Sequence, residues 1–206
     1  VHRDLESLME KGREIRGKYS GNKIDLCSIL SGKTGGCSED CAFCAQSVHR
    51  KGCIEETDLI SKESLFDYCS EMEGNVDRFS IVTSGRTMDE DFEELASFYK
   101  ALDEKYSFNL CASHGFLTQE QLKELKDSGV KRYHCNIETS ESYFPEICST
   151  HDYNEKIDMI QKAKEAGLEI CSGGIIGMGE SFEDRWEMAM TLKELKVDSV
   201  PINVLL

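Results

Sequence analysis

The sequence is short of proline and of positive charge. It has two prolines among 206 residues, and its 24 lysines and arginines stand against 39 aspartates and glutamates, which gives a net charge of −15. An acidic chain without a basic cluster repels phosphate backbones, so we expect no nucleic acid among its partners. No apolar run approaches the roughly 20 residues that a membrane-spanning helix needs, so we also expect no membrane partner.

Cysteine, in contrast, is abundant, with ten residues. A secreted disulfide scaffold would be shorter and richer in glycine and proline loops, whereas this chain carries long, charged helical segments. We therefore expect a reducing, cytoplasmic compartment and free thiols, some of which bind metal. Cys69 and Cys148 fit no ligand pattern and are interpreted as packed or incidental thiols.

Short apolar runs alternate with helical patterns along the chain. The runs cover 24–30, 78–84, 108–114, 132–139, 168–177 and 199–206. The helical patterns cover 61–73, 88–106, 117–129, 154–167 and 182–196, and a further amphipathic helix is predicted in 1–21. This order predicts a parallel α/β architecture. A doubly wound sheet and a β/α barrel of the TIM type both fit, and polar–apolar alternation within the strands favours the barrel.

The chain accounts for about six of the eight β/α units of a full barrel. It begins with Val1 and stops within the sixth apolar run. We expect residues 1–206 to form a single barrel domain whose C-terminal part lies outside this sequence.

The most informative motif is a loop with three cysteines directly after the first predicted strand. Cys37, Cys41 and Cys44 have C-x3-C-x2-C spacing. Three interpretations fit such a loop: a zinc site completed by Cys53 or His49, a disulfide, or a 4Fe–4S cluster bound by three thiolates. The cluster would leave one iron without a protein ligand, and an open position is where a cofactor can coordinate. The carboxyl end of a barrel strand is also where active sites of such barrels lie.

The C-x3-C-x2-C loop, with Phe43 before its third cysteine, resembles the radical S-adenosylmethionine (radical SAM) superfamily. Within it, "KTGGCSEDCAFCAQS", "NIETS", "CSGGIIGMGE" and "SVPIN" resemble the biotin synthase family. That resemblance runs from about Ile24 to the last residue. It implies that S-adenosylmethionine binds the open iron, that a 5′-deoxyadenosyl radical forms, and that an auxiliary iron–sulfur cluster supplies the sulfur inserted between C9 and C6 of dethiobiotin.

Further properties and alternatives accompany this resemblance. We expect an electron donor such as flavodoxin or ferredoxin, and a homodimer. Another radical SAM enzyme of the same group, such as a methylornithine-forming mutase or a hydrogenase maturase, is the alternative enzyme. A metal-binding protein without catalysis is the alternative outside enzymes.

A second group of cysteines lies in the middle of predicted strands. Cys27, Cys111 and Cys171 come from the first, third and fifth strands, and we expect them to face the barrel axis and bind the auxiliary cluster. The other interpretation is that each is a buried small apolar residue. Family members with a 2Fe–2S auxiliary cluster use a second-strand cysteine where this chain has Ser80, a poor iron ligand. A 4Fe cubane with an extra sulfide is therefore favoured over 2Fe–2S.

The resemblance also implies cofactor and substrate residues. Asn136 and Glu138 match positions that contact S-adenosylmethionine, and Asn136 and Asn203 match positions that contact the substrate. Strand alternation places His134 on the face of Asn136 and Glu138, and Cys135 on the opposite face. The loop "VTSGR" after the second strand contains Thr83 and Ser84, which match a segment that binds the methionyl amine. No residue is assigned as a catalytic acid, base or nucleophile.

Overall fold

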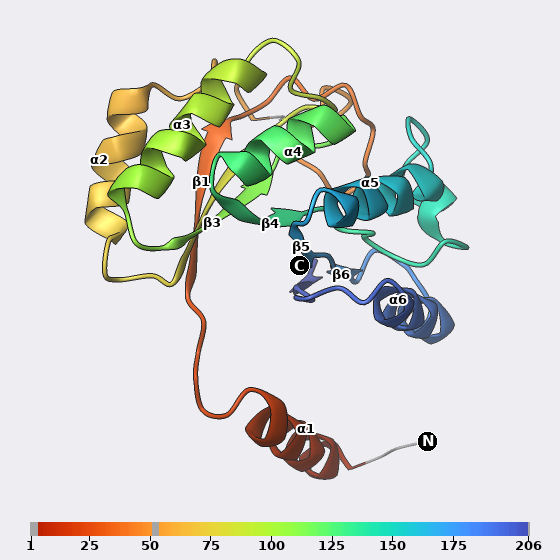
Figure 1. The fold of residues 1–206 in the computed structure, drawn as a ribbon. Coiled ribbons are helices and arrows are strands. Elements are labelled where there is room, and N and C mark those ends of the chain that lie inside the picture. Colours follow the sequence, from red (N-terminus) through yellow and green to blue (C-terminus); the bar gives the residue numbers. More distant parts are fainter. Residues whose placement is uncertain (1–3, 51–53, 206) are drawn as a thin grey trace.

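A computed structural model describes residues 4–50 and 54–205 and shows a curved parallel sheet with helices packed against it (Figure 1). The sheet has the order β1-β2-β3-β4-β5, so neighbours in the chain are neighbours in the sheet. The strands are β1 (Cys27–Lys33), β2 (Arg78–Thr83), β3 (Asn109–Ser113), β4 (Val130–His134) and β5 (Glu169–Cys171). This constant direction of winding is that of a β/α barrel, and the barrel prediction is confirmed.

Two further strands, β6 (Gly174–Ile176) and β7 (Ile202–Val204), pair with each other. Single bridges, Glu138 with Gly174 and Cys171 with Ser199, connect them to the main sheet. The predicted run 168–177 is therefore not one strand, because it breaks at Gly173. A Cβ at Gly173 would lie 1.8 Å from the carbonyl oxygen of Pro201, so only glycine permits this close approach.

The helices follow the predicted patterns closely. They are α1 (Leu5–Tyr19), α2 (Lys62–Met72), α3 (Phe92–Lys105), α4 (Gln119–Asp127), α5 (Tyr153–Glu165) and α6 (Phe182–Glu194), with a 3-10 turn η1 (Phe144–Glu146). Capping boxes begin α4, α5 and α6, because a side-chain oxygen at each N-cap satisfies a free backbone N–H. In α4 the capping box is formed by Thr118 and Gln121.

The core lies between the sheet and its helices, where Phe79, Leu95, Leu122 and Tyr133 are almost completely buried. Burying such side chains contributes about 1.5–3 kcal/mol each. Helix α1 lies apart from these layers (Figure 1), and none of its residues is buried. Within 4–50 and 54–205, no helix combines the length and apolar character needed to cross a membrane.

Candidate active site

The three cysteines of the C-x3-C-x2-C motif lie in the loop that follows β1. Backbone bonds shape this loop: Cys37 N–H donates to Gln46 O at 3.1 Å, and Cys44 N–H donates to Cys41 O at 3.1 Å. Cys37 is buried, whereas Cys41 and Cys44 are half-buried. The loop thus presents three thiols from eight consecutive positions at the carboxyl edge of the sheet, as predicted.

A carboxylate between the first two cysteines anchors the loop to the rest of the site. Glu39 is buried, and its Oε2 accepts hydrogen bonds from Thr150 Oγ1 at 2.9 Å, from Arg86 Nη1 at 3.1 Å and from His151 Nδ1. Burial alone would raise the pKa of Glu39, but the hydrogen bonds from His151 and Thr150 outweigh it and lower the pKa. Glu39 is therefore an anion that joins the cysteine loop to the loops after β2 and β4.

The neighbouring carboxylate makes a second attachment to the same segment. Asp40 Oδ1 accepts hydrogen bonds from Ser149 N–H at 2.9 Å and from Thr150 N–H at 3.3 Å. The bonds from Ser149 lower the pKa of Asp40. In addition, Ala42 N–H donates to Ile147 O at 2.8 Å. Residues 39–42 and 147–151 therefore form a continuous contact, which we call the clasp.

Glu138 lies in an unusual backbone conformation just beyond β4. Its φ is +70°, which is not a strand conformation, and β4 has already ended at His134. The predicted face shared by His134, Asn136 and Glu138 is therefore wrong as a strand face. Asn136 Oδ1 accepts a hydrogen bond from Gly173 N–H at 2.9 Å, which ties this turn to the break between β5 and β6.

The Glu138 carboxylate is itself without a complete set of partners. Its Oε2 is buried and has no hydrogen-bond partner among the described residues. Burial raises its pKa to about 7, opposed by the charge of Lys156 and a hydrogen bond from Asn136. A buried acceptor in this state fits a ligand that brings hydroxyl or amine donors.

Lys156 is a cation that the sequence reasoning missed. It lies on α5, 5.4 Å above the Phe116 ring, and forms no ion pair with the described residues. Burial lowers its pKa, but the nearby Cys135 and Glu138 raise it more, so the net shift is upwards. A half-buried ammonium that has no ion-pair partner among the described residues and lies beside the cysteine loop favours an anionic ligand.

Thr83 is the last residue of β2, and Ser84 begins the loop that follows it. The Thr83 hydroxyl is buried and hydrogen-bonded to His114 Nδ1 at 2.9 Å. Ser84 Oγ is buried and has no partner among the described residues. Ser84 is therefore a second polar group that a ligand could complete.

The second group of cysteines lines a single cavity of about 520 Å³ inside the curve of the sheet. Cys27, Cys111 and Cys171 lie on its wall together with Ser80 and His134. The predicted convergence of the three thiols is confirmed, although Cys27 is exposed rather than buried. A hydrogen bond from Cys111 lowers the pKa of Cys27 to about 7, while the same contact raises the pKa of Cys111.

Charge also gathers in this cavity. Arg78 and Arg132 line it beside the thiols. Arg78 pairs with Asp25 at 2.6 Å, and Arg132 pairs with Glu169 at 2.8 Å. Positive charge near thiols favours their thiolate form, which is the form that binds iron.

The predicted substrate residue Asn203 lies elsewhere. It is exposed on β7, opposite Ile175 of β6, and is not among the residues that line the cavity. Its predicted contact with substrate is therefore not visible in this arrangement of side chains.

The family model of the radical SAM superfamily matches residues 32–203. The chain belongs to the radical SAM superfamily. A protein named biotin synthase from Clostridium perfringens (strain 13 / Type A) is 52% identical over 204 residues, which cover 98% of this chain and 64% of that protein. Another biotin synthase, from Clostridium botulinum (strain Langeland), is 50% identical and covers 100% of this chain and 65% of that protein. The chain spans slightly less than two thirds of the length of these curated relatives.

Solved structures of two other enzymes share the fold. Methylornithine synthase (PylB) superposes with a TM-score of 0.89 at 18% identity, covering 98% of this chain and 60% of that one. The FeFe-hydrogenase maturase HydG from Carboxydothermus hydrogenoformans gives 0.80 at 18% identity, covering 97% and 49%. At such identities the likeness concerns the barrel alone.

Superfamily membership implies a 4Fe–4S cluster and S-adenosylmethionine, and the residues present fit both. Burial, with Cys148 adding to it, raises the pKa of Cys41, and burial also raises that of Cys44. Buried thiols of this kind ionise when a cation displaces their protons, which is what cluster iron does. The unpartnered atoms of Glu138 and Ser84 and the unpaired Lys156 fit a ligand with polar and anionic groups.

The possible zinc ligands near the loop cysteines differ from those predicted from the sequence. His49 Nε2 lies 3.0 Å from Ser38 O on the exposed side of the loop, and Cys53 lies outside the described residues. Instead, Cys41 is close to Cys148 and His151, whose ligand atoms all lie within 4.8 Å of one another. Cys148 is buried, as expected of a packed thiol, but it also lies in contact with Cys41 of the motif.

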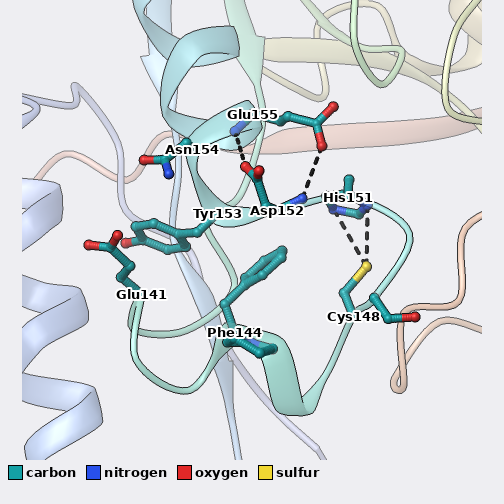
Figure 2. A pocket seen from close by; sticks show the side chains of 10 residues that line it. Glu141, Phe144, Cys148, His151, Asp152, Tyr153, Asn154 and Glu155 are labelled. Atoms are coloured by element: carbon teal, nitrogen blue, oxygen red, sulfur yellow. Dashed lines mark hydrogen bonds between the residues drawn. The ribbon is translucent and has the colours of Figure 1, made fainter.

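Cys148 and His151 also border a pocket of about 590 Å³, formed entirely by residues 141–155 (Figure 2). Figure 2 shows the capping box of Asp152 and Glu155 on the same wall. The contact between this segment and the cysteine loop is evident only in the folded structure, because no ligand spacing in the sequence links the two.

Proposed function

We propose that the protein containing this chain is a biotin synthase, which inserts sulfur between C9 and C6 of dethiobiotin. The observation that carries the proposal is the identity of about half of all residues, over nearly the whole chain, with curated biotin synthases. Two separate groups of thiols, one in the loop and one inside the cavity, support it, because the reaction needs a radical source and a sulfur source.

The loop cysteines Cys37, Cys41 and Cys44 would hold a 4Fe–4S cluster. Such a cluster, together with S-adenosylmethionine, would supply the radical chemistry of the site. Lys156 would offer positive charge to the carboxylate of S-adenosylmethionine, and Glu138 would accept hydrogen bonds from its ribose hydroxyls. Both residues are half-buried, so each contact would be stronger than it is in bulk water.

The cavity thiols of Cys27, Cys111 and Cys171 would hold the auxiliary cluster, which supplies sulfur when bound. Three thiolates suit a cubane with one iron left for an extra sulfide, whereas Ser80 is a poor substitute for the second-strand thiolate of a 2Fe–2S cluster. Arg132 and its neighbour Arg78 would offset the negative charge of such a cluster.

Substrate binding would use the amides at the carboxyl edge of the sheet. Asn136 accepts from Gly173 N–H and hydrogen-bonds the Glu138 carboxylate, so it orients Glu138. One amide hydrogen is then left to donate to the ureido carbonyl of dethiobiotin. We also propose that Asn203, on β7, hydrogen-bonds the ureido group of dethiobiotin.

The reaction would also need a one-electron donor of low potential, such as flavodoxin or ferredoxin. All nine described cysteines are free thiols, which favours a reducing, cytoplasmic location. We also propose that the protein is a homodimer.

The decisive experiment incubates the anaerobically reconstituted protein with S-adenosylmethionine, reductant and dethiobiotin, and measures products by mass spectrometry. We expect 5′-deoxyadenosine and biotin together, and neither with the Cys41→Ala variant. Formation of 5′-deoxyadenosine without biotin would identify a different radical SAM reaction. One zinc per chain with no iron or sulfide would contradict enzyme activity of this type.

A further inference from the structure

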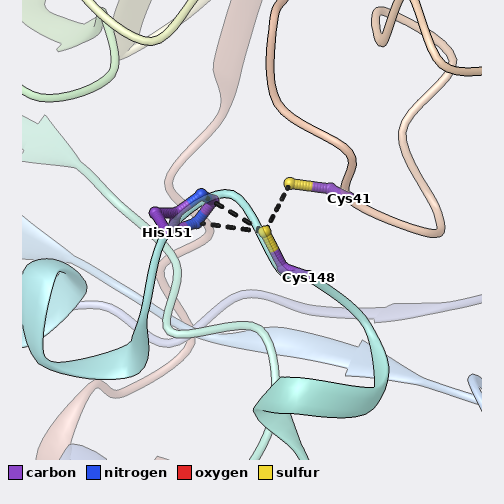
Figure 3. A group of neighbouring side chains, drawn as sticks. All are labelled: Cys41, Cys148 and His151. Atoms are coloured by element: carbon purple, nitrogen blue, oxygen red, sulfur yellow. Dashed lines mark hydrogen bonds between the residues drawn. The ribbon is translucent and has the colours of Figure 1, made fainter.

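The thiol of Cys148 lies directly beside a cysteine of the C-x3-C-x2-C motif. Its Sγ is 3.8 Å from the Sγ of Cys41, although 107 residues separate the two (Figure 3). The clasp fixes this approach, because Ala42 N–H donates to Ile147 O at 2.8 Å and Cys148 N–H donates to Phe144 O at 3.2 Å. Cys148 is 6% exposed, so its side chain has little contact with bulk water.

The hydrogen bonds around Glu39 determine where nearby protons point. An ionised carboxylate only accepts, so the Thr150 hydroxyl and His151 Nδ1–H both donate to Glu39 Oε2. This network assigns the proton of neutral His151 to Nδ1. Nδ1 lies 3.3 Å from Cys148 Sγ but, with its proton directed at Glu39, it has no lone pair to accept the thiol hydrogen.

Among the described residues, Thr150 Oγ1 at 3.6 Å, His151 Nε2 at 3.9 Å and Cys41 Sγ at 3.8 Å can accept the hydrogen of Cys148. The Asp40 carboxylate also interacts with the Cys148 thiol, but its two oxygens already accept four hydrogen bonds from Ser149 and Thr150. Thr150 Oγ1 already accepts from Asp40 N–H at 3.1 Å. When Cys41 ligates iron its sulfur is a thiolate, and a charged acceptor is preferred over a neutral one.

We propose that Cys148 donates a hydrogen bond to the Cys41 thiolate and thereby raises the reduction potential of a 4Fe–4S cluster held by the loop. Hydrogen bonds to the sulfurs of such clusters stabilise the reduced, more negative state. Cys148 is thus a positioning residue that acts through Cys41. The inference rests on the cluster of the proposed function but not on its substrate.

A competing use of the same atoms is a mononuclear metal site. Cys41, Cys148 and His151 are ligand types that zinc prefers, and their atoms lie within 4.8 Å of one another. Such a site would take Cys41 away from the cluster, so the two uses exclude each other. The experiment below separates them.

The test is an EPR-monitored redox titration of the anaerobically reconstituted protein, with no dethiobiotin added. We compare the wild type with Cys148→Ala, Cys148→Ser and the control Cys69→Ala, which removes a buried thiol from α2. In Cys148→Ala we expect the ratio of reduced to oxidised cluster at a fixed potential to fall about tenfold, equivalent to about 59 mV for a one-electron couple. Cys148→Ser keeps a donor and should stay close to the wild type, as should Cys69→Ala.

Iron analysis of the same samples makes every outcome decisive. Four irons and an unchanged midpoint potential in Cys148→Ala would overturn the proposal, and loss of the cluster from both Cys148 variants would make Cys148 a ligand instead. One zinc per chain that disappears in Cys148→Ser would establish the mononuclear site and also overturn it. A wild type that holds no iron cluster would refute the proposed function itself, whereas an unchanged potential refutes only the role of Cys148.

Discussion

Arg86 Nη1 lies 3.1 Å from Glu39 Oε2, so the loop after β2 holds a carboxylate that sits between two cysteines of the motif. Arg86 also pairs with Glu155 at the start of α5. The spacer between Cys37 and Cys41 is therefore a structural part of the site, because it connects the cysteine loop to two neighbouring loops.

The first prediction concerns this connection. In Glu39→Gln the side chain loses its charge and one acceptor position, so the bonds from Arg86 and His151 weaken. Hydrogen bonds to charged groups contribute about 1.5–3 kcal/mol each. We expect iron release from the reconstituted cluster to an anaerobic chelator to become at least about tenfold faster.

The matched control for this experiment is Glu120→Gln, which changes an exposed carboxylate in the first turn of α4. It should release iron at the wild-type rate. Equal rates for Glu39→Gln and the wild type would show that the contacts of Glu39 do not hold the loop.

The second prediction concerns the unpaired cation on α5. Lys156→Met removes the ammonium and keeps most of the apolar stem, so the affinity for S-adenosylmethionine should fall by about 1–3 kcal/mol, or about 5-fold to 150-fold. Lys162→Met, on an exposed position of the same helix, is the control. Calorimetry that finds equal affinity in both variants would exclude Lys156 as the anion-binding group.

The third prediction uses the raised pKa of Glu138. An unfolded glutamate ionises near its ordinary value of 4.5, whereas folded Glu138 does so at about 7 because of burial. The folded state therefore holds an extra proton between these values, and the free energy of unfolding falls as the pH rises through that window. The loss amounts to about 3 kcal/mol above pH 7.

Glu138→Gln removes this cost, because the amide stays neutral. We expect the variant to unfold at a higher temperature than the wild type at pH 8, with the difference vanishing at pH 4. Glu141→Gln, which alters a neighbouring exposed carboxylate, should show no such pH dependence. A constant difference between Glu138→Gln and the wild type across this range would contradict the raised pKa.

The same side chain is also predicted to bind the cofactor. Glu138→Ala should weaken the binding of S-adenosylmethionine by about 1–3 kcal/mol, as expected for a lost charge-assisted hydrogen bond. Calorimetry at pH 8, where the carboxylate is ionised, gives the clearest measurement. Unchanged affinity would reject the contact.

The last prediction concerns the cavity thiols. Anaerobic reconstitution should give about eight irons per chain if Cys27, Cys111 and Cys171 hold a second cubane, about six for a 2Fe–2S cluster, and about four if only the loop cluster forms. Cys27→Ala should keep the formation of 5′-deoxyadenosine but lose biotin. The control Cys69→Ala should retain both, and biotin formation at the normal rate by Cys27→Ala would remove β1 from the auxiliary site.

Local sequence patterns determined the elements and the cysteine loop. The spacing of Cys37, Cys41 and Cys44 places three thiols in one loop whatever surrounds it. Capping boxes and helical periodicity likewise act within a few residues, so the helices could be predicted with nearly correct ends. Strand alternation also predicted that Cys111 and Cys171 face one cavity, because the period of a strand is fixed at two.

Tertiary structure decided the features that depend on contacts between distant segments. Strand alternation does not extend to Glu138, because β4 ends at His134 and the Glu138 N–H, at a φ of +70°, donates to Gly173 O in a distant segment. The contact of Cys148 with Cys41 spans 107 residues and has no ligand spacing to reveal it. Burial likewise belongs to the folded molecule alone. The sequence shows a glutamate at 138 and a lysine at 156, but only the packing around them creates an unpartnered acceptor and an unpaired cation.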